Sequence, residues 1–147
     1  MKNVEYVYTF GMDRETLEQR LEQTGVGVLS LAKESDAYAV PIAYHYDGDS
    51  VFLRFAFEGD STKREYLEAT SEACLCLYGI ESDDENWSVL VQGTLRQLTG
   101  TERDRFDALT VNETFERLHV FDQAIEAIDI EVYELLADSI TGRTTES

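Results

Sequence analysis

A short polar segment after an apolar run carries the residues best suited to bind an anion. The run 51–57 is followed by the start of a predicted helix, which reads Ser61, Thr62, Lys63 and Arg64. Ser61 is a natural N-cap. Cations in a first helical turn oppose the helix dipole, which favours anions there. Together with Arg54 these residues form the densest basic cluster in the middle of the chain, and the pattern predicts a phosphate site.

The same residues have a structural interpretation that needs no ligand. Ser61 would only cap the helix, and the two cations would pair with neighbouring carboxylates: Glu58, Glu65 or Glu68. Pro41, the only proline, is equally ambiguous because proline cannot donate to a strand ladder. It marks either an edge or barrel corner, or a place where a bound group replaces the neighbouring strand.

Composition limits the classes of function. The chain has 147 residues and is expected to form one domain, residues 1–147. Its 30 acids and 12 bases give a formal net charge of −18, which argues against nucleic-acid binding. Acid spread along the chain with few lysines resembles proteins of extreme halophiles. In such proteins, concentrated salt screens the self-repulsion.

Nothing in the sequence predicts a membrane span or a metal site. No apolar run is long enough to cross a bilayer, and no apolar signal core follows the N-terminus, so we expect a cytoplasmic protein. Cys74 and Cys76 lack the partners of a zinc site and are expected to be buried free thiols. His45 and His119 form no ligand pattern.

Hydrophobic periodicity predicts a mainly β domain with flanking helices. Expected strands are 26–33, 38–46, 50–57, 73–80, 86–98 and 128–140, and expected helices begin at Asp13, Ser61 and Thr101. The first ten residues are expected to be an arm or a short strand. Gly93 indicates a bulge or a close backbone approach within its strand. Short connections favour a six-stranded, largely antiparallel split β-barrel, because closure removes exposed edges.

The order of these segments resembles the pyridoxamine 5′-phosphate oxidase-like family of split-barrel flavoproteins. The resemblance is carried by Gly-Val-Gly-Val-Leu-Ser-Leu, Tyr-Ala-Val-Pro-Ile-Ala-Tyr, Asp-Gly-Asp, Val-Phe-Leu-Arg-Phe, Ser-Thr-Lys and Trp-Ser-Val-Leu-Val-Gln-Gly-Thr-Leu. It covers roughly residues 17–98, and Ile-Thr-Gly-Arg near the end of the chain fits too. No single piece is specific, but their order and spacing together are.

The resemblance implies that FMN lies in a cleft at the interface of a homodimer. Pro41 and Ile42 would face the flavin ring. The phosphate would be held by Arg54, Ser61, Thr62 and Lys63. Further contacts near the cofactor are implied for Trp87, Ser88 and Gln92.

The implied function is that of a flavin-dependent oxidoreductase acting on a small molecule. Many relatives carry histidine at the position of Arg54, and other branches of the family use haem or a deazaflavin. Alternatives are therefore a non-catalytic flavin- or haem-binding dimer, or a dimeric scaffold without cofactor on the same fold. The chain lacks the C-terminal arginine and histidine pattern of true pyridoxamine phosphate oxidases, and no catalytic acid, base or nucleophile is evident.

Overall fold

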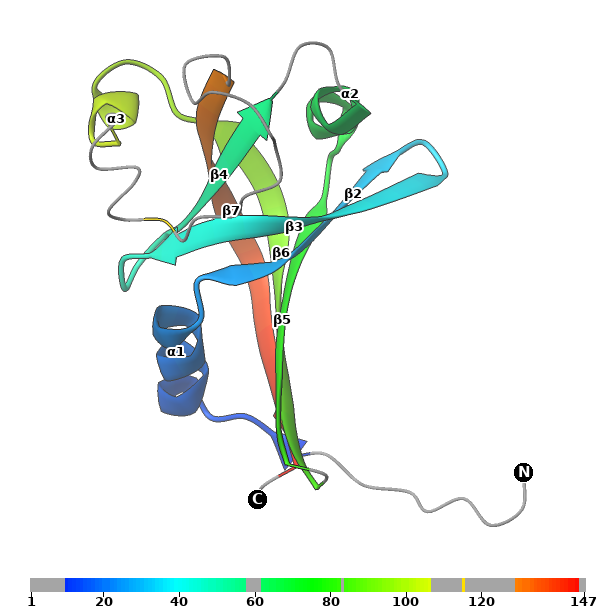
Figure 1. Ribbon diagram of the computed structural model, residues 1–147, viewed down its shortest axis with the longest axis vertical. Coiled ribbons are helices and arrows are strands. Elements are labelled where there is room, and N and C mark those ends of the chain that lie inside the picture. The colour runs from blue at the N-terminus through cyan, green and yellow to red at the C-terminus, as the bar shows by residue number, and fades with distance from the viewer. Residues whose placement is uncertain (1–9, 58–61, 83, 107–114, 116–128, 146–147) are drawn as a thin grey trace.

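The computed structural model describes residues 10–57, 62–82, 84–106, 115 and 129–145, which form a sheet with three helices (Figure 1). In chain order, its elements are β1 (Phe10–Gly11), α1 (Arg14–Gln23), β2 (Val26–Lys33), β3 (Asp36–Tyr46), β4 (Val51–Phe57), α2 (Thr62–Ala69), β5 (Ala73–Ser82), β6 (Glu85–Gln97), α3 (Gly100–Asp104) and β7 (Asp129–Thr144).

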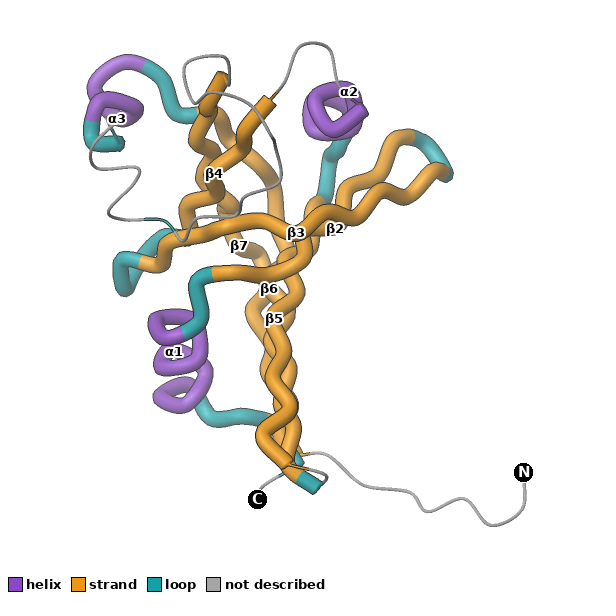
Figure 2. Tube along the Cα trace, viewed as in Figure 1, coloured by secondary structure: helices purple, strands orange, loops and turns teal. Residues whose placement is uncertain are grey.

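The strands form a closed ring. Their order is β1-β7-β4-β3-β2-β5-β6, and an additional β6–β7 pairing joins the last strand back to β7. Every pairing is antiparallel. The predicted six-stranded antiparallel barrel is therefore confirmed, with β1 as a short addition to the end of β7. Figure 2 shows β5, β6 and β7 continuing as a long ribbon beyond the crossing β2–β3 hairpin.

Alternation along the strands builds the core inside the ring. Leu29, Leu53, Leu75, Val89 and Val91 are completely buried there, as the period of two requires. The helices α1 and α2 add Leu17, Leu21 and Leu67 to the same cluster. A second cluster covers the outer face of β3, β4 and β7, and it consists of Ala43, Phe52, Leu98, Phe106, Phe115 and Val132.

Local signals place the predicted turns. The Asp13 carboxylate accepts from the N–H of Thr16 at 2.8 Å and caps α1, and Gly25 follows the helix with a φ of 128°. In the β3–β4 turn, the Asp47 carboxylate accepts from the N–H groups of Asp49 and Ser50 at 2.9 and 2.7 Å. The helix and the hairpin predicted from these residues are confirmed.

The bulge at Gly93 and the end of β7 both depend on pairing with a neighbouring strand as well as on the local sequence. Gly93 lies at a register shift between β6 and β7, and a Cβ there would come within 2.0 Å of the Leu136 carbonyl oxygen, so the predicted bulge and close approach are confirmed. The predicted end of the last strand at residue 140 is wrong, because β7 continues to Thr144, where it pairs with Trp87 of β6 and Phe10 of β1.

Other expectations are met in part. Cys74 and Cys76 are free thiols, but both are half-buried on the outer face of β5 rather than buried. Most of the helix predicted from residue 101 to about 118 lies outside the described residues, and so do residues 1–9. Among the described helices, none is long and apolar enough to cross a membrane.

Candidate functional site

The predicted site residues of β3 and β4 lie where these two strands separate. The strands pair from Tyr46 and Val51 as far as Ala43 and Arg54. Beyond that point, residues 36–42 of β3 pair with β2, and residues 55–57 of β4 pair with β7. We call the opening between residues 36–42 and 55–57 the split. Pro41 is exposed on its β3 side, whereas the side chain of Ile42 is 3% exposed and belongs to the core.

Lys63 reaches the β4 side of the split from the first turn of α2. Its Nζ donates to the carbonyl oxygen of Ala56 at 3.1 Å and lies 6.0 Å from the centre of the Phe57 ring. The side chain is half-buried, and this burial lowers the pKa of its amine below the ordinary value of 10.5. The amine is thus a partly desolvated cation in a strongly acidic protein, which favours an anion beside it.

The neighbouring Arg64 has a structural role. Its guanidinium forms an ion pair with Glu131 of β7 at 2.8 Å and lies 4.0 Å from the centre of the Phe57 ring. This pair fastens α2 to the barrel. Glu65 pairs with Lys33 of β2. The ligand-free interpretation is therefore right that Arg64 pairs with a carboxylate, and the structure adds Glu131, which that interpretation did not name. Glu58, one of the partners it named, lies outside the described residues.

The remaining phosphate candidates lie around the same opening. Arg54 is half-buried and follows Phe52 on the outer side of β4, opposite Ala43. Thr62 is exposed at the start of α2. Ser61 lies outside the described residues. The structure therefore gathers Pro41, Arg54, Thr62 and Lys63 from three elements around the split.

The predicted residues of β6 lie elsewhere in the same chain. Ala56 pairs with Ile130 at one end of β7, and Trp87 pairs with Thr144 at the other. Residues 130 to 144 of an extended strand span about 45 Å. Trp87 is 7% exposed and packs under the guanidinium of Arg20 at 4.6 Å.

The other two candidates of this strand are more accessible than Trp87. Ser88 is half-buried and Gln92 is exposed. With Trp87, Ser88 lines a depression of about 470 Å³ at the far end of the ribbon, together with Tyr78, Gly79, Ile80 and Asn86. Gln92 pairs with Ser139, part of the way along β7.

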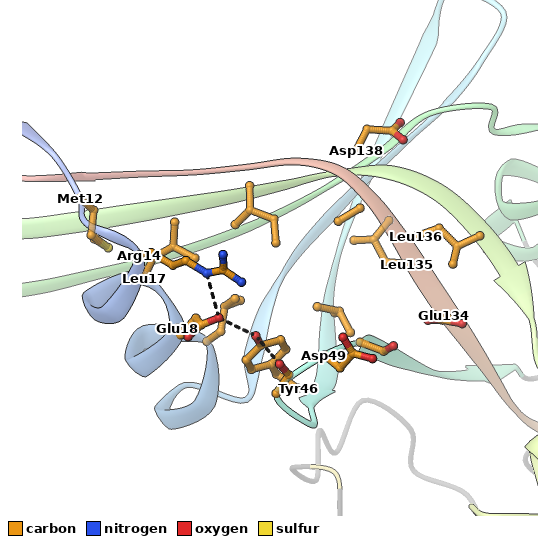
Figure 3. Close-up of a pocket in the computed structure, with 16 residues that line it drawn as sticks. Met12, Arg14, Leu17, Glu18, Tyr46, Asp49, Glu134, Leu135, Leu136 and Asp138 are labelled. Atoms are coloured by element: carbon orange, nitrogen blue, oxygen red, sulfur yellow. Dashed lines mark hydrogen bonds and ion pairs between the residues drawn. The ribbon is translucent and has the colours of Figure 1, made fainter.

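A larger groove of about 760 Å³ lies between α1, the β3–β4 turn and β7 (Figure 3). Leu17, Leu21, Val51 and Leu135 supply apolar walls, and Glu18, Asp49, Glu134 and Asp138 supply carboxylates. Among the described residues that line it, the one cation is Arg14, which is 90% exposed and contacts Glu18 at 3.4 Å. The four carboxylates would repel a phosphate in this groove. Sequence reasoning missed it because its residues come from separate segments with no shared local pattern.

The described residues contain no group of three or more side chains that could hold a metal ion. His45 is half-buried and makes an edge contact with Phe115, with ring centres 6.2 Å apart. That Cys74 and Cys76 belong to no metal site stays a prediction.

Comparison with known proteins identifies the relatives of this arrangement. Residues 13–144 match the family model described as pyridoxamine 5′-phosphate oxidase. No curated protein matches the chain significantly.

Solved structures share the fold at low sequence identity. An FAD-binding protein from Mesorhizobium loti is 20% identical, with a TM-score of 0.70 over 92% of this chain and 97% of that one. An FAD-binding protein from Mycobacterium smegmatis is 15% identical, with a TM-score of 0.66 over 91% and 96%. The FAD- and haem-binding protein of that organism is 19% identical, with a TM-score of 0.65 over 95% and 74%. These likenesses show the fold.

Proposed function

The chain belongs to the pyridoxamine 5′-phosphate oxidase family, and from that premise we propose that it binds FMN at the split and acts as a flavin-dependent oxidoreductase on a small molecule. The observation that carries the proposal is Lys63, a half-buried cation at the edge of the split in a chain of net charge −18. Burial disfavours the charged form of this amine, and a phosphate beside it would favour that form again.

A phosphate monoester fits the polar groups around the split. At neutral pH it carries close to two negative charges and accepts several hydrogen bonds. Lys63 and Arg54 would supply the opposing charge, and Thr62 a hydroxyl group. The first N–H groups of α2 would add donors, since the first turn of a helix leaves them without intrahelical partners.

The ring system of the flavin would lie against β3. Pro41 is exposed beside the split, and the backbone at Pro41 and Ile42 has β2 as its neighbour on the other side. When bound, FMN supplies hydride- or electron-transfer chemistry, and the protein binds and orients it. Phe57 at the end of β4 is buried in the core, and its ring is approached by the cations of Lys63 and Arg64.

We further propose that the protein works as a homodimer, because the outer face of the sheet beside the split is apolar. Leu90, Cys76, Val28 and Pro41 are successive cross-strand partners on β6, β5, β2 and β3. Farther along this face, Tyr78 is 64% exposed and Ile80 76%. Contiguous exposed apolar groups of this kind mark interaction surfaces.

A second copy on this face would also explain how the predicted cofactor-contacting residues of β6 could reach the cofactor. Trp87 and Ser88 are too far from the split to reach a cofactor bound to their own chain. The same residues of a partner could reach it, because their depression adjoins the apolar face at Tyr78 and Ile80.

A visible spectrum and a titration test the proposal. We expect the purified protein to bind FMN in concentrated KCl, with quenching of flavin fluorescence, and to bind riboflavin more weakly because riboflavin has no phosphate. FAD is the comparison ligand, because all three of the named relatives are described as binding it. A Soret band after addition of haemin would favour the haem alternative, and no binding of any flavin would refute the proposal.

Light scattering in the same buffer tests the assembly. The expected mass is twice that of the 16.7 kDa chain. An interface of an obligate dimer should bury more than about 2,000 Å² in total. A monomer that binds FMN tightly would refute the shared site while leaving the flavin function in place.

A further inference from the structure

The split begins at a backbone position whose orientation can be followed from the hydrogen bonds. The N–H of Tyr44 donates to the carbonyl of Gly25 at 2.9 Å, so the backbone groups of Tyr44 face β2. Along an antiparallel strand, backbone groups face the two neighbours alternately. Ala43 therefore faces β4, where it pairs with Arg54, and Pro41 faces the same way.

The carbonyl opposite Pro41 can be identified in the same manner. Arg54 faces β3, so Ala56 does too, since the register of β4 against β7 runs without a shift from residue 51 to residue 57. Continuing the β3–β4 register by two residues would place Pro41 opposite Ala56. The next bond of the ladder would then run from the N–H of residue 41 to the Ala56 carbonyl. Proline has no N–H, so this bond cannot form.

Lys63 supplies the donor that proline lacks. Its Nζ donates to the oxygen of Ala56 at 3.1 Å, from the first turn of a helix that packs against β2. A backbone carbonyl removed from water is unfavourable unless it has a partner. The amine thus stabilises β4 in a position where β3 no longer pairs with it.

We propose that Pro41 and Lys63 are a pair of positioning residues that hold β3 and β4 apart. Pro41 ends the ladder, and Lys63 satisfies the carbonyl that the ladder would have used. This role belongs to the protein without any ligand and goes beyond the proposed function. Its consequence for that function is that the opening is preformed rather than made by the cofactor.

A double-mutant cycle on the ligand-free protein tests the pair. Pro41→Ala restores an N–H at residue 41, and Lys63→Met removes the donor while keeping a side chain of similar length. In the Pro41 background, Lys63→Met should lower the folding equilibrium constant about tenfold, the effect of one lost hydrogen bond. In the Pro41→Ala background the new N–H can replace the amine at Ala56, so the loss caused by Lys63→Met should be about fivefold smaller than in the Pro41 background.

Lys33→Met is the matched control. Lys33 also contacts α2, through Glu65, but it pairs with Asp36 at the turn of the β2–β3 hairpin, whereas Pro41 pairs with Val28. Its substitution should have the same effect with either residue at position 41. Unfolding in urea at one protein concentration, in about 1 M KCl, supplies all the equilibrium constants. If Lys63→Met costs the same in both backgrounds, the two residues are not coupled and the proposal is wrong.

Amide hydrogen exchange supplies a second readout. In Pro41→Ala, the new amide at residue 41 should exchange at least about tenfold more slowly than an exposed amide, because it bonds to Ala56. Exchange at the rate of an exposed amide would overturn the proposal. Riboflavin affinity separates this inference from the proposed function. A protected amide with unchanged riboflavin binding would support the positioning pair and count against a flavin in the split.

Discussion

Replacing Lys63 by methionine should distinguish the contribution of the flavin phosphate to binding from that of the flavin ring. Methionine keeps an unbranched side chain in the half-buried position and removes the charge. A charge-assisted hydrogen bond to a phosphate contributes roughly 1.5–3 kcal/mol, so FMN affinity should fall about ten- to a hundredfold. Riboflavin affinity should change by less than about twofold, because that ligand has no phosphate.

The structure adds a cost in stability that the sequence did not suggest. A first-turn lysine is expected to contribute little to folding and even to oppose the helix dipole. Since the amine of Lys63 donates to the Ala56 carbonyl, its loss should lower the free energy of unfolding by about 1.4 kcal/mol, which is the tenfold change in folding equilibrium expected above. Binding must therefore be measured where the variant is fully folded.

The assay is fluorescence titration of both ligands in about 1 M KCl, where the Debye length is about 3 Å and the charge of −18 contributes little long-range repulsion. Lys63→Arg retains the charge and should keep most of the difference between FMN and riboflavin. Equal losses for the two ligands, or none for either, would refute the assignment of the phosphate to Lys63.

The pH dependence follows from the same residue. Burial lowers the pKa of Lys63 in the free protein, and a bound phosphate would raise it again. FMN affinity should accordingly decrease as the pH rises through the lowered pKa, at a pH below the ordinary 10.5 of lysine. Lys63→Met should lose this dependence. A wild-type affinity that stays constant over this range would contradict the proposed contact.

Three further predictions concern the fold. Tyr44 donates to the Leu21 carbonyl at 2.7 Å, and burial raises its pKa to about 12. Its contribution to the free energy of unfolding is therefore complete below pH 10 and is lost as the pH rises from 10 through 12. Tyr44→Phe should reduce the slope of the unfolding free energy against pH over that range. Gly93→Ala should lower the free energy of unfolding by about 3 kcal/mol or more, measured by thermal unfolding, because the added Cβ would clash with the Leu136 carbonyl. Gly11→Ala is the control and should be nearly neutral, because an added Cβ there would have no atom within 4 Å. The melting temperature should rise between dilute buffer and about 1 M KCl as salt screens the repulsion, and an unchanged value would contradict the halophilic interpretation.

Local sequence patterns were enough to predict most elements of the fold. Asp13 caps its helix, Asp47 shapes its turn, and the period of two in β4 and β5 places alternate residues in the core. The end of β7 could not be predicted in this way. Thr-Gly-Arg-Thr resembles a polar tail when considered alone, and it becomes a strand because β6 and β1 supply partners there.

The candidate site was predictable where it depends on neighbouring residues and not where it depends on pairing. The sequence predicts an anion beside Lys63, which stays a prediction. It could not show that the amine contacts Ala56, because that contact depends on the end of the β3–β4 ladder. The pairing of Arg64 with Glu131 was missed for a similar reason, since Glu131 lies on β7, and only the closure of the barrel brings it to α2.

The length of β7 bears directly on how the site works. The Lys63 contact at Ala56 and the side chain of Trp87 lie beside opposite ends of this strand, roughly 45 Å apart along it. A resemblance that assigns both residues to one cofactor is consistent with this geometry only if two chains contribute. Mixed dimers test this directly, because a chain with Lys63→Met and a chain with its depression filled by Gly79→Leu should together form one intact site. A Cβ at Gly79 would come within 2.4 Å of the Trp87 indole nitrogen. Recovery of about half of the wild-type FMN-binding capacity would support the shared site, and a capacity no greater than that of the two separate variants would contradict it.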